Sequence, residues 1–110
     1  MNKYIIINTT TNNMSDVINI QKTLLDEKLA ACIQVSKIKS YYNWNNKKCE
    51  SEEFLIVIKT KKSLFNQIKD KIISVHSYDL PEIISYEINN ISEEYAKWID
   101  ENTKEEIKWT

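Results

Sequence analysis

The sequence predicts an α+β protein of the ferredoxin-like class, a split βαβ sandwich with an additional C-terminal helix. Strand-like and helix-like hydrophobic patterns follow one another in the order β-α-β-β-α-β, and one more helical pattern comes after them. Only Asn45-Asn46 separates the two middle strand patterns, and this dipeptide suits a two-residue hairpin turn. With 110 residues, the chain has the length of a single domain, residues 1–110. This order predicts a four-stranded antiparallel sheet with two helices on one face.

The first half of the chain carries a strand pattern, a helix pattern and a long strand pattern. Residues 3–9 contain consecutive apolar side chains, which is typical of a central strand covered on both faces. In residues 16–29, apolar positions recur every three or four residues and predict an amphipathic helix with Lys28 in its last turn. Residues 31–44 predict a long strand, with a bend or bulge at residues 36–39, where the alternation is imperfect.

The second half begins with the other arm of the hairpin. Residues 47–60 predict a strand, and Ser63 is the expected N-cap of a helix that runs to Val75. Residues 82–88 predict a short strand. Ser92 is expected to open a last helix, and the mainly polar residues 103–110 predict a terminal turn or an added strand.

Composition and charge argue against several classes of function. The net charge of −1 provides no basic field for nucleic acid, and no apolar run approaches the length of a membrane span. Glycine is absent, which excludes every glycine-rich phosphate loop. The N-terminal residues lack the pattern of a secretion signal, so a cytoplasmic location is expected. Cys32 and Cys49 show no zinc-type spacing and are expected to be free thiols.

Residues 76–82, with the sequence His-Ser-Tyr-Asp-Leu-Pro-Glu, contain the chain's only histidine and its only proline. They admit three interpretations. The segment is a stiff connection between a helix and a strand, or His76 acts as a base beside Cys32 or Cys49, or its imidazole joins thiols and carboxylates around a metal ion. The spacing of these residues favours neither a catalytic set nor a strong metal site.

Aromatic and apolar side chains gather along the predicted hairpin, at Tyr41, Tyr42, Trp44 and Phe54. A small monomer rarely exposes so much apolar surface, so an oligomer with packed sheets is expected. Stacking of nucleic-acid bases on Tyr41, Tyr42 and Trp44, beside Lys39, Lys47 and Lys48, is the alternative. Burial at an interface explains the aromatic residues better.

Five segments occur together in a characteristic order. They are Leu29-Ala30-Ala31-Cys32, Ser40-x-Tyr42-x-Trp44, Glu53 with the apolar run to Lys59-Thr60, His76-x-Tyr78-x-x-Pro81-Glu82-Ile83, and Tyr95-x-x-Trp98. Across residues 4–103 the chain thereby resembles the CutA family of divalent-cation tolerance proteins.

The resemblance implies a compact homotrimer of ferredoxin-like subunits, similar in fold and assembly to PII-type signalling proteins. It implies a role in the response to metal ions, copper among them, and no enzymatic reaction. Two functions follow as expectations. One is weak binding of a divalent cation such as Cu²⁺ or Zn²⁺ at subunit boundaries. The alternative is a non-catalytic signalling or scaffold trimer that binds a small molecule or a protein.

Carried onto this sequence, the family's polar cleft residues are Tyr42, Trp44, Glu53, Lys59, His76, Tyr78 and Glu82. The resemblance implies that they lie near a subunit boundary and that His76, Glu53 and Glu82 are the candidate metal ligands. Three positions depart from the family's pattern. Ser77 replaces the usual proline and predicts a less rigid loop, Asn46 replaces the turn glycine, and Asn8 stands where some members have a cysteine, which weakens the copper interpretation.

Overall fold

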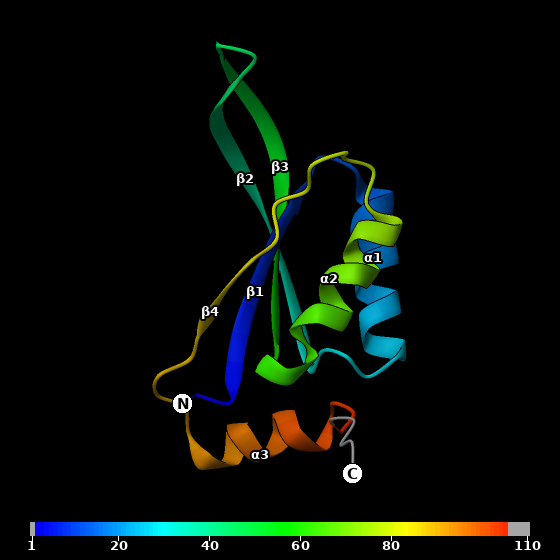
Figure 1. The fold of residues 1–110 in the computed structure, drawn as a ribbon, viewed down its shortest axis with the longest axis vertical. Coiled ribbons are helices and arrows are strands. Elements are labelled where there is room, and N and C mark those ends of the chain that lie inside the picture. Colours follow the sequence, from blue (N-terminus) through cyan, green and yellow to red (C-terminus); the bar gives the residue numbers. More distant parts are fainter. Residues whose placement is uncertain (1, 106–110) are drawn as a thin grey trace.

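The computed structural model describes residues 2–105, which form a four-stranded antiparallel sheet in the order β2-β3-β1-β4 (Figure 1). In chain order the elements are β1 (Tyr4–Thr11), α1 (Met14–Asp26), β2 (Cys32–Trp44), β3 (Lys47–Lys61), the 3₁₀ turn η1 (Lys62–Leu64), α2 (Phe65–Val75), β4 (Ile84–Glu87) and α3 (Glu93–Glu101). The predicted fold class and element order are confirmed. None of the helices within residues 2–105 has the length and apolarity needed to cross a membrane.

The core lies between one face of the sheet and the helices α1 and α2. Alternate residues of β1 face this core, so Ile5 and Ile7 are only 2% and 0% exposed. They belong to the same cluster as Leu24 of α1 and Ile68 of α2. Figure 1 shows α1 and α2 on the same side of the sheet, with α3 below the lower end of the strands. The strand β1 lies between β3 and β4, the central position predicted for it.

The other face of the sheet, called the open face below, is not covered by α1 or α2. Its side chains alternate with those of the core, and they include Ile6, Leu55, Val57, Ile84 and Tyr86. Ile84 and Tyr86 are 52% and 50% exposed. The sheet therefore presents apolar side chains on both faces, and only one face is packed against helices.

The strands β2 and β3 form a long hairpin that extends beyond the rest of the molecule (Figure 1). Asn45 and Asn46 close it with φ angles of 51° and 62°, as expected for a tight two-residue turn with both residues left-handed. The pairing runs without interruption from Cys32 opposite Lys59 to Trp44 opposite Lys47. Of the bend or bulge expected at residues 36–39, the bulge is therefore absent. The alternation fails there because much of this part of β2 is exposed, so neither face has to be consistently apolar.

The other elements depart from the sequence predictions mainly at their ends. Ser92 caps α3 as expected, because its hydroxyl accepts a hydrogen bond from the Tyr95 N–H at 3.2 Å. Ser63 is not the cap of α2: it lies inside η1, and α2 begins at Phe65 without a side-chain cap. The strand β4 is shorter than the predicted residues 82–88. The prediction for residues 103–110 falls partly on residues 106–110, which lie outside the described residues.

The helix α1 ends at Asp26, earlier than predicted, and Lys28 is not in its last turn. The Leu29 N–H donates to the Leu24 carbonyl at 2.9 Å and the Lys28 N–H to the Leu25 carbonyl at 3.1 Å. This pair of bonds is a Schellman motif, which needs a left-handed residue just after the helix. Lys28 occupies that position with φ of 55°, because the chain contains no glycine.

We expect Lys28→Gly to stabilise the protein by about 0.5–1 kcal/mol, because glycine adopts the left-handed conformation without the steric cost of a Cβ atom. Urea denaturation measures the free energy of unfolding. Lys28→Ala is the matched control, since it removes the charge but keeps Cβ, and no gain is expected from it. An equal gain from both variants would contradict the conformational explanation.

Candidate functional site

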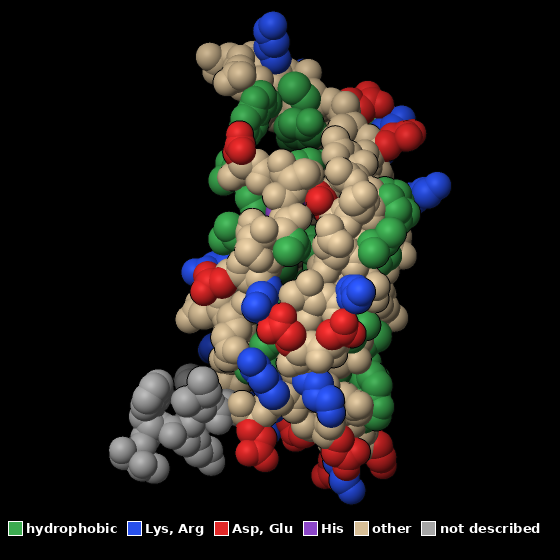
Figure 2. Space-filling view, turned by 90° about the vertical axis from the view of Figure 1, so that its right-hand side faces the viewer, with side chains coloured by type: hydrophobic (Ala, Val, Ile, Leu, Met, Phe, Trp, Pro, Cys, Tyr) green, Lys and Arg blue, Asp and Glu red, His purple; other side chains and the backbone are tan. Residues whose placement is uncertain are grey.

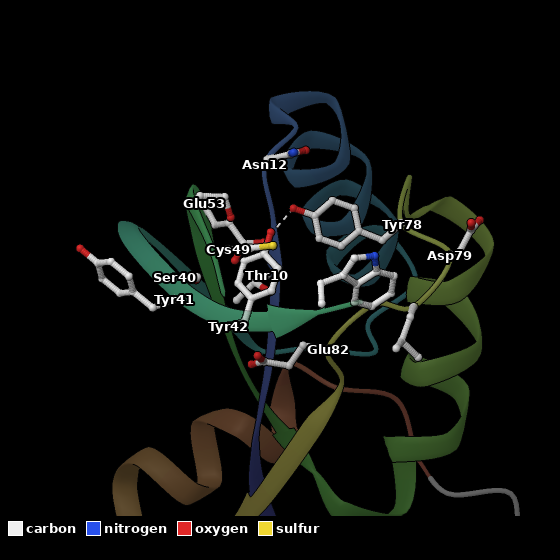
Figure 3. Close-up of a pocket in the computed structure, with 13 residues that line it drawn as sticks. Thr10, Asn12, Ser40, Tyr41, Tyr42, Cys49, Glu53, Tyr78, Asp79 and Glu82 are labelled. Atoms are coloured by element: carbon white, nitrogen blue, oxygen red, sulfur yellow. Dashed lines mark hydrogen bonds between the residues drawn. The ribbon is translucent and has the colours of Figure 1, made fainter. Parts of the chain in front are cut away.

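A cavity of about 640 Å³ opens where the hairpin and the upper part of the open face meet the segment 76–83 that follows α2 (Figure 3). It is lined by Tyr42 and Trp44 from β2, by Cys49 and Glu53 from β3, and by Tyr78 and Glu82 from the segment after α2. Tyr41, at the rim, points away from the other labelled side chains in Figure 3. The cavity therefore brings the two arms of the hairpin together with a segment that is distant from them in the sequence.

Glu53 is the most deeply placed charged group of the cavity, with only 9% of its surface exposed. The Tyr78 hydroxyl donates a hydrogen bond to Glu53 Oε2 at 2.7 Å, drawn as a dashed line in Figure 3. Burial and, after it, this bond to a carboxylate raise the pKa of Tyr78 well above its ordinary value. The phenol therefore keeps its proton and remains a hydrogen-bond donor to Glu53 at neutral pH.

Glu53 shares the lining with two further carboxylates, Glu82 and Asp79, and the Asp79 side chain points away from Glu53 and Glu82 in Figure 3. Burial, and then the charge of Glu53, raise the pKa of Glu82 above its usual value. Neither effect is opposed by a basic side chain, because no lysine or arginine is among the described residues that line the cavity. Glu53 and Glu82 thus make a negative pocket without a counter-charge.

His76 lies beside this cavity and not in its lining. Its side chain is 0% exposed, and Nε2 lies 2.8 Å from the Thr10 carbonyl oxygen, while Nδ1 accepts a hydrogen bond from the Tyr78 N–H at 3.0 Å. In this arrangement Nε2 faces an acceptor and Nδ1 faces a donor. Both ring nitrogens are occupied, so the imidazole has no lone pair directed at Glu53 or Glu82.

A buried carboxylate that the sequence patterns did not single out as a site, Asp16, anchors the segment that carries His76 and Tyr78. Asp16 Oδ2 accepts hydrogen bonds from Thr11 Oγ1 at 2.7 Å, from Ser77 Oγ at 2.5 Å and from the Ser77 N–H at 3.1 Å. Burial by itself would raise the pKa of Asp16, but these bonds outweigh it and hold the pKa below its ordinary value. Its first-turn position in α1 was the only sequence signal, and that signal indicates dipole stabilisation and not burial.

Ser77 supplies two of these three bonds. A proline at this position has neither the N–H nor the hydroxyl, so the bonds to Asp16 depend on the serine. The loop is therefore held by hydrogen bonds where the family's pattern has a rigid ring.

The remaining candidates are divided between the cavity and its surroundings. Tyr42, Trp44, Glu53, Tyr78 and Glu82 are brought together in the cavity lining. Lys59 lies elsewhere on the sheet, with its amino group 5.6 Å from the centre of the Tyr95 ring of α3. Within residues 2–105, no three His, Cys, Asp or Glu side chains converge as a group that could hold a metal ion.

The charge pattern outside the cavity is mixed. On the side of the molecule in Figure 2, lysines and acidic side chains are interspersed, and hardly any of the histidine is visible. The mixed pattern on this side, dominated by neither sign, contrasts with the purely acidic charge of the cavity.

Comparisons with known proteins agree with one another. The family described as CutA1 divalent ion tolerance protein matches residues 5–102. The divalent-cation tolerance protein CutA of Pyrococcus horikoshii is 35% identical over 100 residues, which cover 91% of this chain and 98% of that protein. The chloroplastic CutA of Arabidopsis thaliana is 33% identical over 101 residues, 91% of this chain and 56% of that protein. The solved structure of the periplasmic divalent cation tolerance protein CutA from Archaeoglobus fulgidus superposes with a TM-score of 0.89 at 33% identity, covering 92% of this chain and 99% of that one.

We expect Asp16→Asn to lower the free energy of unfolding at pH 7 by about 1–3 kcal/mol, because it weakens a buried, charged hydrogen-bond acceptor. The folded pKa of Asp16 is lower than its unfolded value of about 3.9. Its ionised form therefore contributes stability above that value, and the contribution is lost as the pH falls through the folded pKa. Urea denaturation from pH 7 to pH 2 should show a smaller acid loss in the variant than in the wild type.

The matched control is Glu94→Gln, which removes an exposed carboxylate from the first turn of α3 and should change the pH dependence little. If Asp16→Asn and the wild type lose the same stability on acidification, the proposed role of Asp16 is wrong.

Proposed function

The chain belongs to the CutA1 divalent ion tolerance protein family, and from this premise we propose that it acts in divalent-cation tolerance as a non-catalytic, cation-binding homotrimer. One observation carries the proposal: Glu53 and Glu82 share a cavity whose described lining contains no basic side chain. A cation would relieve the repulsion between the two carboxylates. The cavity is therefore the place where we expect a cation to bind.

For a divalent metal ion, the proposed ligands are the oxygens of Glu53 and Glu82. Carboxylate oxygens are hard ligands, and Zn²⁺ accepts them as well as imidazole and thiolate. His76, the third candidate, is engaged by Thr10 and Tyr78. Two carboxylates from one chain support weak binding of Zn²⁺ or Cu²⁺, with water or another subunit completing the coordination.

The size and the aromatic walls of the same cavity favour a second function. Its volume of about 640 Å³ lies within the range of small-molecule sites, and Tyr42, Trp44 and Tyr78 give it an aromatic lining. A signalling or scaffold trimer that binds a small molecule would use such a cavity.

We propose no catalytic reaction for this chain. A thiol–imidazole pair would need the His76 ring to accept a proton from Cys32 or Cys49. The Nδ1 lone pair, which would accept it, already takes the Tyr78 N–H. This supports a binding role for the cavity.

The homotrimer is proposed from the open face. Ile84 and Tyr86 are about half exposed there, beside Ile6 and Val57. A patch of this kind is typical of a surface that a second copy covers. A cytoplasmic location stays a prediction, since one relative is named as chloroplastic and one as periplasmic.

We expect Glu82→Gln to weaken the binding of Zn²⁺ and Cu²⁺ by about tenfold or more, because it removes one of two carboxylate charges. Isothermal titration calorimetry measures the affinity of each metal. The matched control is Glu52→Gln, since Glu52 is exposed and its side chain points to the opposite face of β3 from Glu53. Equal metal affinity in the wild type and Glu82→Gln would rule out this site.

We expect native mass spectrometry to give an assembly of three chains of 13.0 kDa each, and Tyr86→Lys to shift it toward smaller species. A lysine on the open face of β4 would have to be buried by the second copy without a partner. Ile18→Lys is the control, because Ile18 is 51% exposed on α1, in the helical layer on the other side of the sheet. Dissociation by Ile18→Lys and not by Tyr86→Lys would place the interface on the helices.

A further inference from the structure

The cavity combines negative charge with aromatic surface, and an inorganic ion uses only the first of these. Glu53 and Glu82 supply the charge, and Tyr42, Trp44 and Tyr78 supply the aromatic surface. A hydrated divalent ion holds its water strongly and gains little from a ring face. An organic ammonium ion sheds water more easily, and its charge and its methylene groups both interact favourably with aromatic rings.

Lys37 and Lys39 of β2 border Glu53 from a second hollow and do not line the cavity itself. Lys39 Nζ lies 3.1 Å from Glu50 Oε1, and both side chains are about half exposed. In the described lining of the cavity, Glu53 and Glu82 are accompanied by no lysine or arginine, so a cationic ligand would neutralise their charge.

The polar groups of the lining also suit a ligand that carries N–H donors. Glu53 Oε2 already accepts the Tyr78 hydroxyl at 2.7 Å, and Glu53 Oε1 has no hydrogen-bond partner in the described part of the chain. Glu82 offers two more acceptor oxygens, and Ser40 and Ser51 add hydroxyls. A primary ammonium group donates three hydrogen bonds to acceptors of this kind, whereas a quaternary ammonium group donates none.

We propose that the cavity is a binding site for an organic diamine, with Glu53 and Glu82 each taking an ammonium group and the aromatic rings covering the chain between them. This inference rests on the proposed cation-binding function and names its ligand class. A diamine carries the same charge as a divalent metal ion. It differs in making use of the aromatic walls, which provides a way to tell the two ligands apart.

The test is isothermal titration calorimetry of the full chain at pH 7.5 with putrescine, butylamine, 1,4-butanediol and ZnCl₂. We expect saturable binding of putrescine, about tenfold or more tighter than that of butylamine, because the second ammonium group meets a second carboxylate. The uncharged 1,4-butanediol should not bind measurably. Equal affinity for the diol and the diamine would overturn the proposal, since the carboxylates would then have no role.

Two variants separate the diamine from the metal ion. Tyr42→Leu removes a ring face and keeps both charges, so it should weaken putrescine about three- to thirtyfold and leave Zn²⁺ binding unchanged. Glu82→Gln should weaken both ligands. Tyr41→Leu is the matched control, since Tyr41 is 71% exposed and points away from the cavity (Figure 3). Circular dichroism verifies that each variant is folded.

The outcomes distinguish the two proposals. Binding of Zn²⁺ that is sensitive to Glu82→Gln, with no binding of putrescine, overturns the diamine site and keeps the proposed cation-binding function. Binding of neither ligand overturns both. Binding of putrescine that is as strong in Tyr42→Leu as in the wild type contradicts the role of the aromatic walls.

Discussion

The Oδ2 atom of Asp16 connects the segments on which the cavity depends. Asp16 belongs to α1, its partner Thr11 ends β1, and its partner Ser77 follows α2. Hydrogen bonds to a charged group contribute about 1.5–3 kcal/mol each, and removing the acceptor would leave the buried Thr11 hydroxyl without this partner. Three such bonds explain why this carboxylate can remain ionised at 4% exposure.

The Asp16 carboxylate positions the groups of the cavity through a short series of contacts. Ser77, held by Asp16, fixes the start of the segment that leads to β4. His76, next to it, bonds the Thr10 carbonyl with one nitrogen and accepts the Tyr78 N–H with the other. Tyr78 in turn bonds Glu53 on β3. The imidazole therefore has a structural role, and it acts on the cavity by positioning Tyr78.

The proposed ligands follow from the composition of the cavity, which combines acidic charge with aromatic surface. Two carboxylates with no lysine or arginine in the same described lining favour a cation, but within residues 2–105 they are not joined by the further ligands that a tight metal site requires. Aromatic rings favour an organic body over a hydration shell. This composition is the basis of the proposal that the site holds a metal ion only weakly and suits an organic cation of the same charge better.

Local patterns by themselves determined the order of the elements, the Asn45-Asn46 turn and the Ser92 cap, because periodicity, turn chemistry and capping depend on residues a few positions apart. The resemblance to the CutA family, through motifs on the hairpin and the segment after α2, identified five of the residues that line the cavity. Only the tertiary structure decided three further features. The Lys59 amino group lies over the Tyr95 ring, both ring nitrogens of His76 are hydrogen-bonded within the protein, and Asp16 anchors the segment after α2. The bonds responsible join residues 61 and 66 positions apart, Asp16 to Ser77 and Thr10 to His76. A hydrogen-bond partner at that separation is chosen by the packing of strands and helices, and no local sequence pattern records it.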